Sequence, residues 1–237
     1  LADAGQSVRV FSRSKPPGME RADGRVEVFT GDLKSDADLL RAMEGVEGVF
    51  HLARADEKTW SGYLENDVAV TRRIGEACLK AQVKRLVYTG TISSFDAARK
   101  GVVIGEGAPL DPRLDARDLY SRSKGACELA LNELAKTKGL PLVIARPGIV
   151  IGRGGPLQHW GVAMWRGATL CKMWGRGDNP LPFVEIGDVA DGLARAMSTP
   201  GLEGRTFFLV GDPMLSARDY FDEIGRIYGV KMDARAT

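Results

Sequence analysis

The sequence predicts an α/β fold, with a doubly wound, mostly parallel sheet and a small C-terminal lobe. Two observations carry this prediction. Short apolar runs of strand length alternate with segments whose apolar residues recur at helical spacing, and such alternation is typical of a parallel sheet covered by helices on both faces. The chain has 237 residues, of which 44% are hydrophobic and 27% charged, so it can bury a substantial core.

The first half of the chain contains four expected strands. Residues 1–5 read as the last turn of a helix with Gly5 as its C-cap. Ser35 opens a second helix, which ends at Gly45, and a long helical segment covers residues 59–81. The strands are expected at residues 8–12, 26–30, 48–53 and 85–90.

The second half continues the alternation less regularly. Ala126, Leu129, Ala130 and Leu134 recur at helical spacing before a stop at Gly139, which predicts a helix. We expect residues 1–155 to form the core of the fold and residues 156–237 to form mostly a substrate-binding lobe, with some segments returning to the core. The remaining elements are expected as a strand at 140–148, a helix near 157–166, short strands at 170–174 and 183–186, a helix opened by Asp188, a strand at 206–211, and a helix at 216–229 begun by a capping box of Ser216 and Asp219.

The bulk properties exclude several function classes. The net charge is +2, which gives no reason to expect nucleic acid or an acidic membrane as a partner. No apolar run approaches the roughly 20 residues of a membrane span, and no signal-peptide pattern opens the chain. Cys78, Cys127 and Cys171 lie far apart, and the chain has two histidines, so no metal site is expected. A reduced, cytoplasmic setting fits these features.

Tyr120 and Lys124 in the stretch "LYSRSK" are the first candidates for chemistry. Positions i and i+4 of a helix lie on the same face, so the two side chains are expected to be neighbours. A nearby cation favours the ionised form of a phenol, and a phenol that ionises readily is a useful general acid or base. The spacing alone is also common on solvated helix faces, so other features of the chain must decide between the two interpretations.

Polar residues follow several of the expected strands. Asp32 follows the second, Arg54 the third, and Thr91, Ser93 and Ser94 follow the fourth. In a doubly wound sheet, ligands bind outside the carboxyl ends of the strands. Turn chemistry explains each residue singly, but the set in this order indicates a ligand-binding edge.

The chain resembles the extended short-chain dehydrogenases/reductases, the NAD-dependent epimerase/dehydratase family, over nearly its whole length. The segment "TGDLKSDADLLRAMEGVEGVFHLA" is similar to the family's G-D-x-x-D…V-x-H-x-A segment, and "NDVAVTRRIGEACLKAQVKRLVYTGT" to its N-V-x-G-T…V-K-R-x-V-Y-x-S-S segment. The stretches "YSRSK", "ARPGIVIGRGG" and "PFVEIGDVADGLARAM" match Y-x-x-x-K, R-P-x-x-x-Y-G-x-G and F-V-x-V-x-D-V-A. Five motifs in the family's order make the resemblance strong, and it implies a Rossmann-like fold and an enzyme.

The resemblance also implies roles for the candidate residues. Tyr120 is the expected catalytic acid/base, and Lys124 stabilises its ionised form and binds the nicotinamide ribose. Thr91 is the expected hydroxyl that polarises the substrate oxygen, with Ser93 in reserve because "TGTISS" stands where the family often has "TSSV". The expected cofactor contacts are Asp32 and Leu33 at the adenine, Ala53 and Arg54 along the cofactor, and Pro147 and Gly148 at the nicotinamide.

The choice of cofactor is predicted from the end of the strand at residues 8–12. In the dinucleotide-binding fold an acidic residue there binds the ribose 2′-hydroxyl, whereas an arginine suits a 2′-phosphate. Here the strand is followed by Arg13 and Lys15, with no acid before Glu20. We therefore expect NADP to be preferred over NAD, against the simpler interpretation that Arg13 is a solvated loop residue.

The family's glycine-rich phosphate-binding turn does not occur in the sequence. The later "GRGGP" lacks its spacing. In the strand order 3-2-1-4-5-6 the first strand is central, so its neighbours would lack a ladder partner and the pyrophosphate would lack a helix N-terminus. We expect a strand, the glycine turn and most of a helix upstream, roughly 20–30 residues.

Three functions remain open from the sequence. The first is redox chemistry on a sugar or sugar nucleotide, with Arg176 as a candidate substrate contact. The second is NADPH-dependent reduction or dehydrogenation of a less polar small molecule, flavanol-like or sterol-like, which the aromatic and methionine residues between 160 and 174 favour. The third is a non-catalytic NAD(P) sensor, since fold alone does not settle function. Homodimers are common in the family, but the sequence itself does not predict one.

Overall fold

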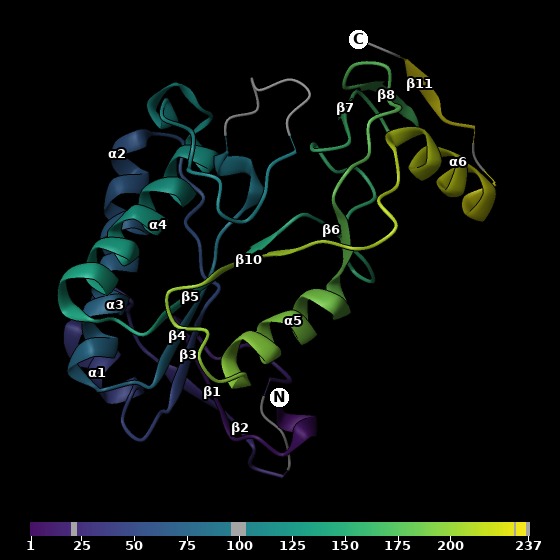
Figure 1. Cartoon of the computed structure of the whole chain (residues 1–237). Helices are drawn as coiled ribbons and strands as arrows, with labels where there is room; N and C mark the ends of the chain where they lie inside the picture. Colours follow the sequence, from purple (N-terminus) through teal and green to yellow (C-terminus); the bar gives the residue numbers. More distant parts are fainter. Residues whose placement is uncertain (20–22, 96–102, 230, 236–237) are drawn as a thin grey trace. The chain divides into compact units, whose positions relative to one another are not determined.

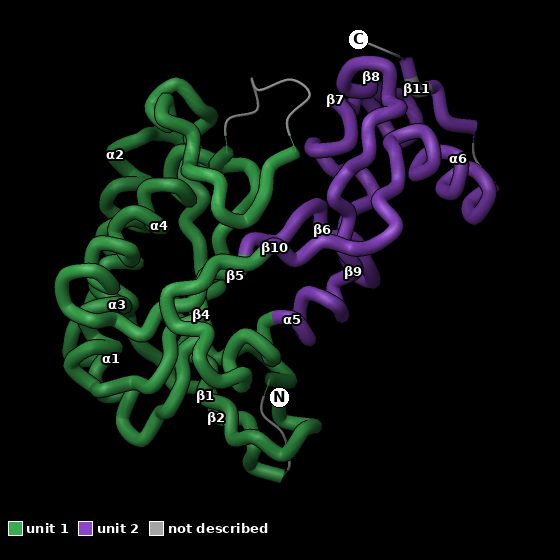
Figure 2. Tube along the Cα trace, in the orientation of Figure 1, with its two compact units in different colours: residues 1–145, 193–207 green, residues 146–192, 208–237 purple. Residues whose placement is uncertain are grey.

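The computed structural model describes residues 1–19, 23–95, 103–229 and 231–235. The chain forms two compact units (Figure 2). Unit 1 comprises residues 1–145 and 193–207, and unit 2 comprises residues 146–192 and 208–237. The first segment of unit 1 ends at Ala145, and residues 193–207 from the second half of the chain also belong to unit 1.

Unit 1 contains the parallel strands that the sequence predicts. Strands β3 (Gly48–His51), β4 (Arg85–Thr89) and β5 (Leu142–Pro147) are parallel, and β10 (Thr206–Leu209) completes a sheet with the order β10-β5-β4-β3. Strands β1 (Val8–Ser12) and β2 (Val26–Thr30) pair in parallel in a second, two-stranded sheet. Strands β1 and β3 belong to different sheets and do not pair with each other.

The helices of unit 1 begin and end where local chemistry predicts. The first turn, η1 (Ala2–Ala4), ends at Gly5, whose φ of 86° is left-handed. Ser35 caps α1 (Asp36–Ala42) by accepting a hydrogen bond from the Asp38 amide. The long helical segment is continuous but changes type along its length: α2 (Trp60–Tyr63), the π-helical η2 (Leu64–Val68) and α3 (Ala69–Lys80) follow each other directly.

The helix predicted around Tyr120 is confirmed as α4 (Leu119–Lys138). It begins at Asp118, whose carboxylate accepts a hydrogen bond from the Ser121 amide, and ends at Gly139, whose φ is 70°. Figure 1 shows α1, α3 and α4 together on one side of the strands.

The four-stranded sheet of unit 1 is buried on both faces. Leu86 and Tyr88 of β4 pack in a cluster with Cys78 of α3 and Leu131 of α4. The intervening residue, Val87, belongs to a second cluster, which residues 193–207 complete. Because successive strand residues point to opposite faces, this alternation covers both sides of the sheet, as the doubly wound prediction requires.

Unit 2 has its own core, which includes Val162, Cys171, Phe183 and Phe221. Its strands form two small sheets: β6 (Ile149–Ile151) is parallel to β9 (Phe183–Glu185), and β8 (Leu170–Met173) lies between β7 (Ala163–Trp165) and β11 (Asp233–Arg235). Helix α6 (Ala217–Tyr228) begins with the predicted capping box, and α5 (Ile186–Ser198) connects the two units in the chain.

The helix predicted near residues 157–166 is wrong. The Gly161 amide donates to Nδ1 of His159 in a tight turn, and β7 follows, paired antiparallel to β8. Val162 and Ala163 are fully buried in the core of unit 2. Pairing with the neighbouring strand β8 and burial in the core of unit 2 therefore override the helical spacing of these residues.

Candidate active site

Tyr120 and Lys124 lie on the first turns of α4, as the spacing predicts. Asp118 fixes the start of this helix through hydrogen bonds from the amide and the hydroxyl of Ser121, at 2.9 and 2.7 Å. Tyr120 is half-buried, whereas Lys124 is only 4% exposed. A lysine this deeply buried is rare unless it is paired or functional.

Several charged and aromatic groups surround the Lys124 ammonium. Its Nζ lies 4.5 Å from the centre of the Tyr88 ring, a cation–π distance. Burial lowers the pKa of Lys124, and the Asp67 carboxylate opposes this by raising the pKa. Arg54 adds a smaller lowering of the pKa of Lys124. The charge state of Lys124 is therefore a balance between desolvation and a neighbouring carboxylate.

The two candidate hydroxyls lie in the turn that follows β4. Thr91 is 6% exposed and caps the short helix η3 (Ile92–Ser94). Its Oγ1 accepts a hydrogen bond from the Ser93 amide at 3.2 Å and donates to the Ser93 Oγ at 3.2 Å. The Ser94 hydroxyl donates to the backbone carbonyl of Ser121 at 3.2 Å. This last bond ties the hydroxyl-bearing turn to the first turns of α4, where Tyr120 lies.

Arg117 and Asp111 brace the same turn from the segment before α4. The Arg117 guanidinium donates to the Ser93 carbonyl at 2.9 Å and lies 3.9 Å from the Asp111 carboxylate. The Asp111 amide donates to the Ser94 carbonyl at 2.9 Å. Asp111 is 4% exposed, and η4 (Leu114–Ala116) lies between the two bracing residues in the chain. The brace limits how far the Thr91 hydroxyl can move relative to α4.

Arg54 lies beside the predicted catalytic tyrosine. Its guanidinium carbon is 5.7 Å from the centre of the Tyr120 ring, and its side chain is about half exposed. Ala53, the preceding residue, is exposed after the end of β3. The structure therefore brings Ala53 and Arg54, two of the expected cofactor contacts, to the region of Tyr120 and Lys124.

The remaining expected cofactor contacts in unit 1 follow β1 and β2. Arg13 is exposed directly after β1. Asp32 is exposed after β2, where its carboxylate accepts a hydrogen bond from the Lys34 amide at 2.9 Å. Leu33 packs against the main core of the unit. Asp32 thus has a turn-forming role of its own, and an adenine contact for it stays a prediction.

Three expected site residues belong to unit 2. Pro147 is buried at the end of β5. A Cβ on Gly148 would lie 1.9 Å from the carbonyl oxygen of Pro182, so this position requires glycine for a close approach of two backbones within the unit. Arg176 is almost fully exposed and pairs with Asp178 at 3.4 Å. The structure gives Gly148 and Arg176 local structural roles, and their ligand contacts stay predictions.

One buried carboxylate of unit 1, that of Asp67, was not predicted from the sequence. Asp67, in η2, is 4% exposed and accepts a hydrogen bond from the Ser123 hydroxyl at 2.6 Å. His51 is also buried, with its Nε2 2.8 Å from the Thr71 hydroxyl, and burial followed by the charge of Lys124 lowers the pKa of His51 to about 3. The sequence contains one signal of the burial of Asp67: this residue lies at helical spacing from Val70, on the helix face that the apolar residues occupy.

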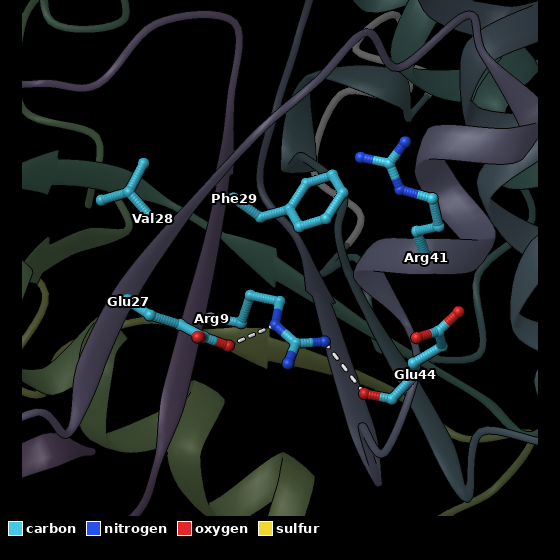
Figure 3. A pocket seen from close by; sticks show the side chains of 6 residues that line it. All are labelled: Arg9, Glu27, Val28, Phe29, Arg41 and Glu44. Carbon is cyan, nitrogen blue, oxygen red and sulfur yellow. Dashed lines mark hydrogen bonds and ion pairs between the residues drawn. The ribbon is translucent and has the colours of Figure 1, made fainter.

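A hollow of about 430 Å³ lies between β2 and α1 (Figure 3). The Arg9 guanidinium lines it and donates to the backbone carbonyls of Ala42 and Glu44, at 2.8 and 2.9 Å, and to the Glu27 carboxylate. These bonds engage the Arg9 guanidinium within its own unit. Its lining residues are Arg9, Glu27, Val28, Phe29, Arg41 and Glu44.

Metal and membrane features can be tested on the described part of the chain. There, no group of three or more His, Cys, Asp and Glu side chains is arranged to hold a metal ion. No helix within the described residues is long and apolar enough to cross a membrane. Cys78, Cys127 and Cys171 are buried free thiols, and burial raises the pKa of Cys127 to about 11, which makes that thiol unreactive near neutral pH.

Comparison with known proteins identifies the family. The family model described as "NAD dependent epimerase/dehydratase family" matches residues 1–210, and the chain belongs to this family of enzymes. It is 29% identical over 170 residues to the 3beta-hydroxysteroid-dehydrogenase/decarboxylase isoform 2 of Arabidopsis thaliana, an alignment covering 70% of this chain and 30% of that protein. It is 27% identical over 219 residues to cinnamoyl-CoA reductase 1 of Petunia hybrida, covering 89% and 64% of the two chains.

A bacterial relative shows a similar degree of sequence identity to this chain. The chain is 28% identical over 227 residues to the 2-alkyl-3-oxoalkanoate reductase of Shewanella oneidensis, covering 90% of this chain and 57% of that protein. The alignments with these three relatives therefore cover between 30% and 64% of the relatives' lengths.

Solved structures share the fold. "MoeE5 in complex with UDP-glucose and NAD" matches all of this chain and 79% of its own, with a TM-score of 0.78 and 22% identity. The UDP-N-acetylglucosamine 4-epimerase from Bacillus cereus matches all of this chain and 78% of its own, with a TM-score of 0.75 and 19% identity. At these identities the likeness establishes the fold of the chain and nothing about its substrate.

The residues of unit 1 fit the nicotinamide ribose half of the family's NAD(P) cofactor. Thr91 and Lys124 supply hydroxyl and ammonium donors of the kind that ribose hydroxyls accept, and the buried Thr89 Oγ1 at the end of β4 has no hydrogen-bond partner among the described residues. The pyrophosphate half is matched less well, because the described part of unit 1 contains no glycine-rich turn between a strand and a helix N-terminus.

Proposed function

We propose that this protein catalyses NAD(P)-dependent oxidation or reduction at a carbon that bears a hydroxyl or carbonyl oxygen. One observation carries the proposal. Tyr120 and the buried Lys124 lie on one face of α4, and the turn bearing Thr91 is hydrogen-bonded to that same part of α4. A phenol, a cation and a second hydroxyl are the groups that proton transfer to and from a substrate oxygen requires.

The chemistry divides between the cofactor and the chain. Bound NAD(P) supplies the hydride donor or acceptor. During oxidation the Tyr120 oxygen takes the proton of the substrate hydroxyl, and during reduction it returns the proton to the carbonyl oxygen. The Lys124 ammonium stabilises the ionised Tyr120, and the Thr91 hydroxyl donates a hydrogen bond to the same substrate oxygen.

The substrates named for the relatives, together with an exposed aromatic residue of unit 2, support a less polar substrate. The relatives at 27–29% identity include dehydrogenases and reductases named for hydroxysteroid, cinnamoyl-CoA and alkyl-oxoalkanoate substrates. Trp160, in unit 2, is 69% exposed and packs edge-on against Trp174, with 5.2 Å between ring centres. Exposed aromatic residues provide contact area for apolar ligands. Trp165 and Met173, two further candidates from the same stretch, do not offer such a surface, because they pack in the core of unit 2.

A sugar nucleotide is the second candidate, since solved structures of this fold are complexes with UDP-sugars and NAD. Arg176, the candidate diphosphate contact, is however already paired with Asp178 in an exposed turn. We expect NADPH-dependent turnover of an aryl or alkyl β-keto ester or a CoA thioester, and no epimerisation of UDP-glucose or UDP-N-acetylglucosamine. Absorbance at the nicotinamide band and product chromatography measure the two activities. Epimerisation without reductase turnover would contradict the proposed substrate class.

Arg13 is the predicted determinant of cofactor choice. Replacing Arg13 with alanine should weaken NADPH binding by roughly 10–100-fold, because charge-assisted hydrogen bonds contribute about 1.5–3 kcal/mol, and should leave NADH binding unchanged. Fluorescence titrations with both nucleotides measure this. The matched control is Arg25→Ala, which removes another exposed arginine of unit 1. An equal loss for both nucleotides would show that Arg13 does not read the 2′-phosphate.

The absolute affinity of the chain for NADPH and NADH tests a separate question, namely whether a further strand is needed for the pyrophosphate site. Strands β1 and β3 belong to different sheets, and a strand between them, followed by a glycine turn and a helix N-terminus, would complete the pyrophosphate site. NADPH and NADH share the pyrophosphate, so the lack of this element should weaken both nucleotides equally. Tight binding of either nucleotide to the 237-residue chain would contradict the need for such a strand.

A further inference from the structure

Asp67 is a buried carboxylate that the proposed proton-transfer steps do not use. It is 4% exposed, and carboxylates are almost never so deeply buried unless they are paired. Its Oδ2 accepts from the Ser123 hydroxyl at 2.6 Å, and its Oδ1 accepts from the Ala55 amide at 3.3 Å. These two bonds connect three elements of unit 1: η2, α4 and the segment after β3.

The backbone around Asp67 is unusual in a way that points to function. Residues Leu64–Val68 are π-helical between two α-helical stretches. Such π segments widen a helix by one residue and occur frequently at functional sites. The preceding residue, Asn66, donates instead to the Glu57 carboxylate at 2.6 Å. Adjacent polar residues in the π segment thus engage different partners, and that of Asp67 lies on α4.

The contact that Asp67 makes on α4 is next to the predicted catalytic lysine. Ser123, its hydroxyl donor, directly precedes Lys124, and Ala55, its amide donor, directly follows Arg54. Of the charged groups that raise the pKa of Lys124, Asp67 has the largest effect. The geometry and the charge therefore link one buried carboxylate to both cations of the site.

We propose that Asp67 is a positioning residue that holds Lys124 in place and charged beside Tyr120. This inference rests on the proposed function, because it assigns Lys124 the role of stabilising ionised Tyr120. The carboxylate does so without touching substrate: it fixes the α4 turn through Ser123 and supplies the negative charge that offsets the cost of burying an ammonium.

The charged and aromatic groups that face Lys124 show which of them can keep its ammonium charged. On its own helix these are Cys127 and Glu128, both buried. From other elements they are Asp67 in η2, Arg54 after β3, His51 of β3 and the Tyr88 ring of β4. Arg54 and His51 do not supply a negative charge, and Glu128 raises the pKa of Lys124 less than Asp67 does. Asp67 is thus the principal counter-charge.

The test is an NMR titration of the Lys124 side chain, labelled with ¹³C at Cε, in the 237-residue chain. Asp67→Asn keeps the size of the side chain and one of its two acceptor oxygens, which can still accept from the Ala55 amide, and removes its charge. We expect the titration midpoint of Lys124 to fall by about one pKa unit, since a neighbouring opposite charge shifts a pKa by ~1–3 units. Glu128→Gln should lower the midpoint by less.

Asp111→Asn is the matched control, because it neutralises another buried carboxylate of unit 1, which pairs with Arg117. We expect it to leave the Lys124 midpoint unchanged. An unchanged midpoint in Asp67→Asn, or an equal fall in Asp111→Asn, would overturn the proposal. If Asp67→Asn does not fold, Asp67→Ser serves in its place, with the same expected fall and the same contradicting results.

Turnover gives a second readout in the assembled enzyme. In Asp67→Asn the Lys124 ammonium should lose its proton at lower pH. The alkaline limb of the plot of kcat against pH should therefore move to lower pH by the same amount as the NMR midpoint. A merely structural role would lower kcat at all pH values without moving the limb. The NMR titration needs no cofactor, so a fall in the midpoint without any turnover would contradict the proposed function while leaving the charge linkage intact.

Discussion

Replacing Tyr120 with phenylalanine is expected to lower kcat by about 10²–10⁴-fold, the usual contribution of a general acid or base. The change removes one oxygen from a half-buried ring and leaves its packing against the Arg54 guanidinium in place. Cofactor affinity, measured by fluorescence titration, should therefore change little. The kinetic measurement is steady-state turnover at saturating nucleotide and substrate.

The two hydroxyls after β4 provide matched variants for the same experiment. Thr91→Val removes the hydroxyl predicted to bind the substrate oxygen and should lower kcat in the same direction, whereas Ser93→Ala removes its neighbour and should have the smaller effect. The reverse order would assign the role to Ser93. Cofactor binding without turnover, unchanged by Tyr120→Phe, would instead support the third interpretation, a non-catalytic sensor of NAD(P).

Replacing Arg85 with methionine is expected to destabilise unit 1 by about 2–3 kcal/mol. Arg85 is 7% exposed, and its guanidinium donates to the carbonyls of Ala196, Met197 and Thr199 at 3.0, 2.8 and 2.6 Å. It also pairs with the Glu203 carboxylate. Removing the donor leaves carbonyls at the end of α5 unsatisfied in a buried place, which carries the cost of their desolvation.

Lys84→Met is the matched control for Arg85→Met. Lys84 precedes Arg85 in the chain and pairs with Glu47 at 3.2 Å, but its side chain is 74% exposed. Exposed ion pairs contribute little, so its loss should change stability by less than about 0.5 kcal/mol. Urea unfolding followed by circular dichroism compares the two variants. Equal effects of the two substitutions would show that the buried bonds to α5 add nothing to stability.

The parts of the fold that the sequence predicted correctly depend on local rules. The predicted ends at Ser35 and Gly139 appear in the structure because capping needs only neighbours in the chain. The strands of unit 1 were found for a similar reason, since a buried strand carries a continuous apolar run. The family prediction is confirmed by the match over residues 1–210, which rests on motifs in a fixed order.

The prediction failed where packing in the folded chain outweighs the local sequence pattern. The expected helix near residues 157–166 is a turn and strand β7, because pairing with β8 and burial of Val162 outweigh local spacing. The first segment of unit 1 ends at Ala145, and residues 193–207 also belong to that unit. No local pattern announces which segment comes back to a core.

The sequence by itself determined that Tyr120 and Lys124 share a helix face, because helical geometry sets the neighbours of every residue four positions away. Only the tertiary structure decided that Lys124 is buried, that Asp67 from another helix opposes the effect of that burial, and that Arg85 holds the end of α5 across more than a hundred residues. Burial and long-range charge depend on which surfaces pack together, and that depends on the whole chain at once.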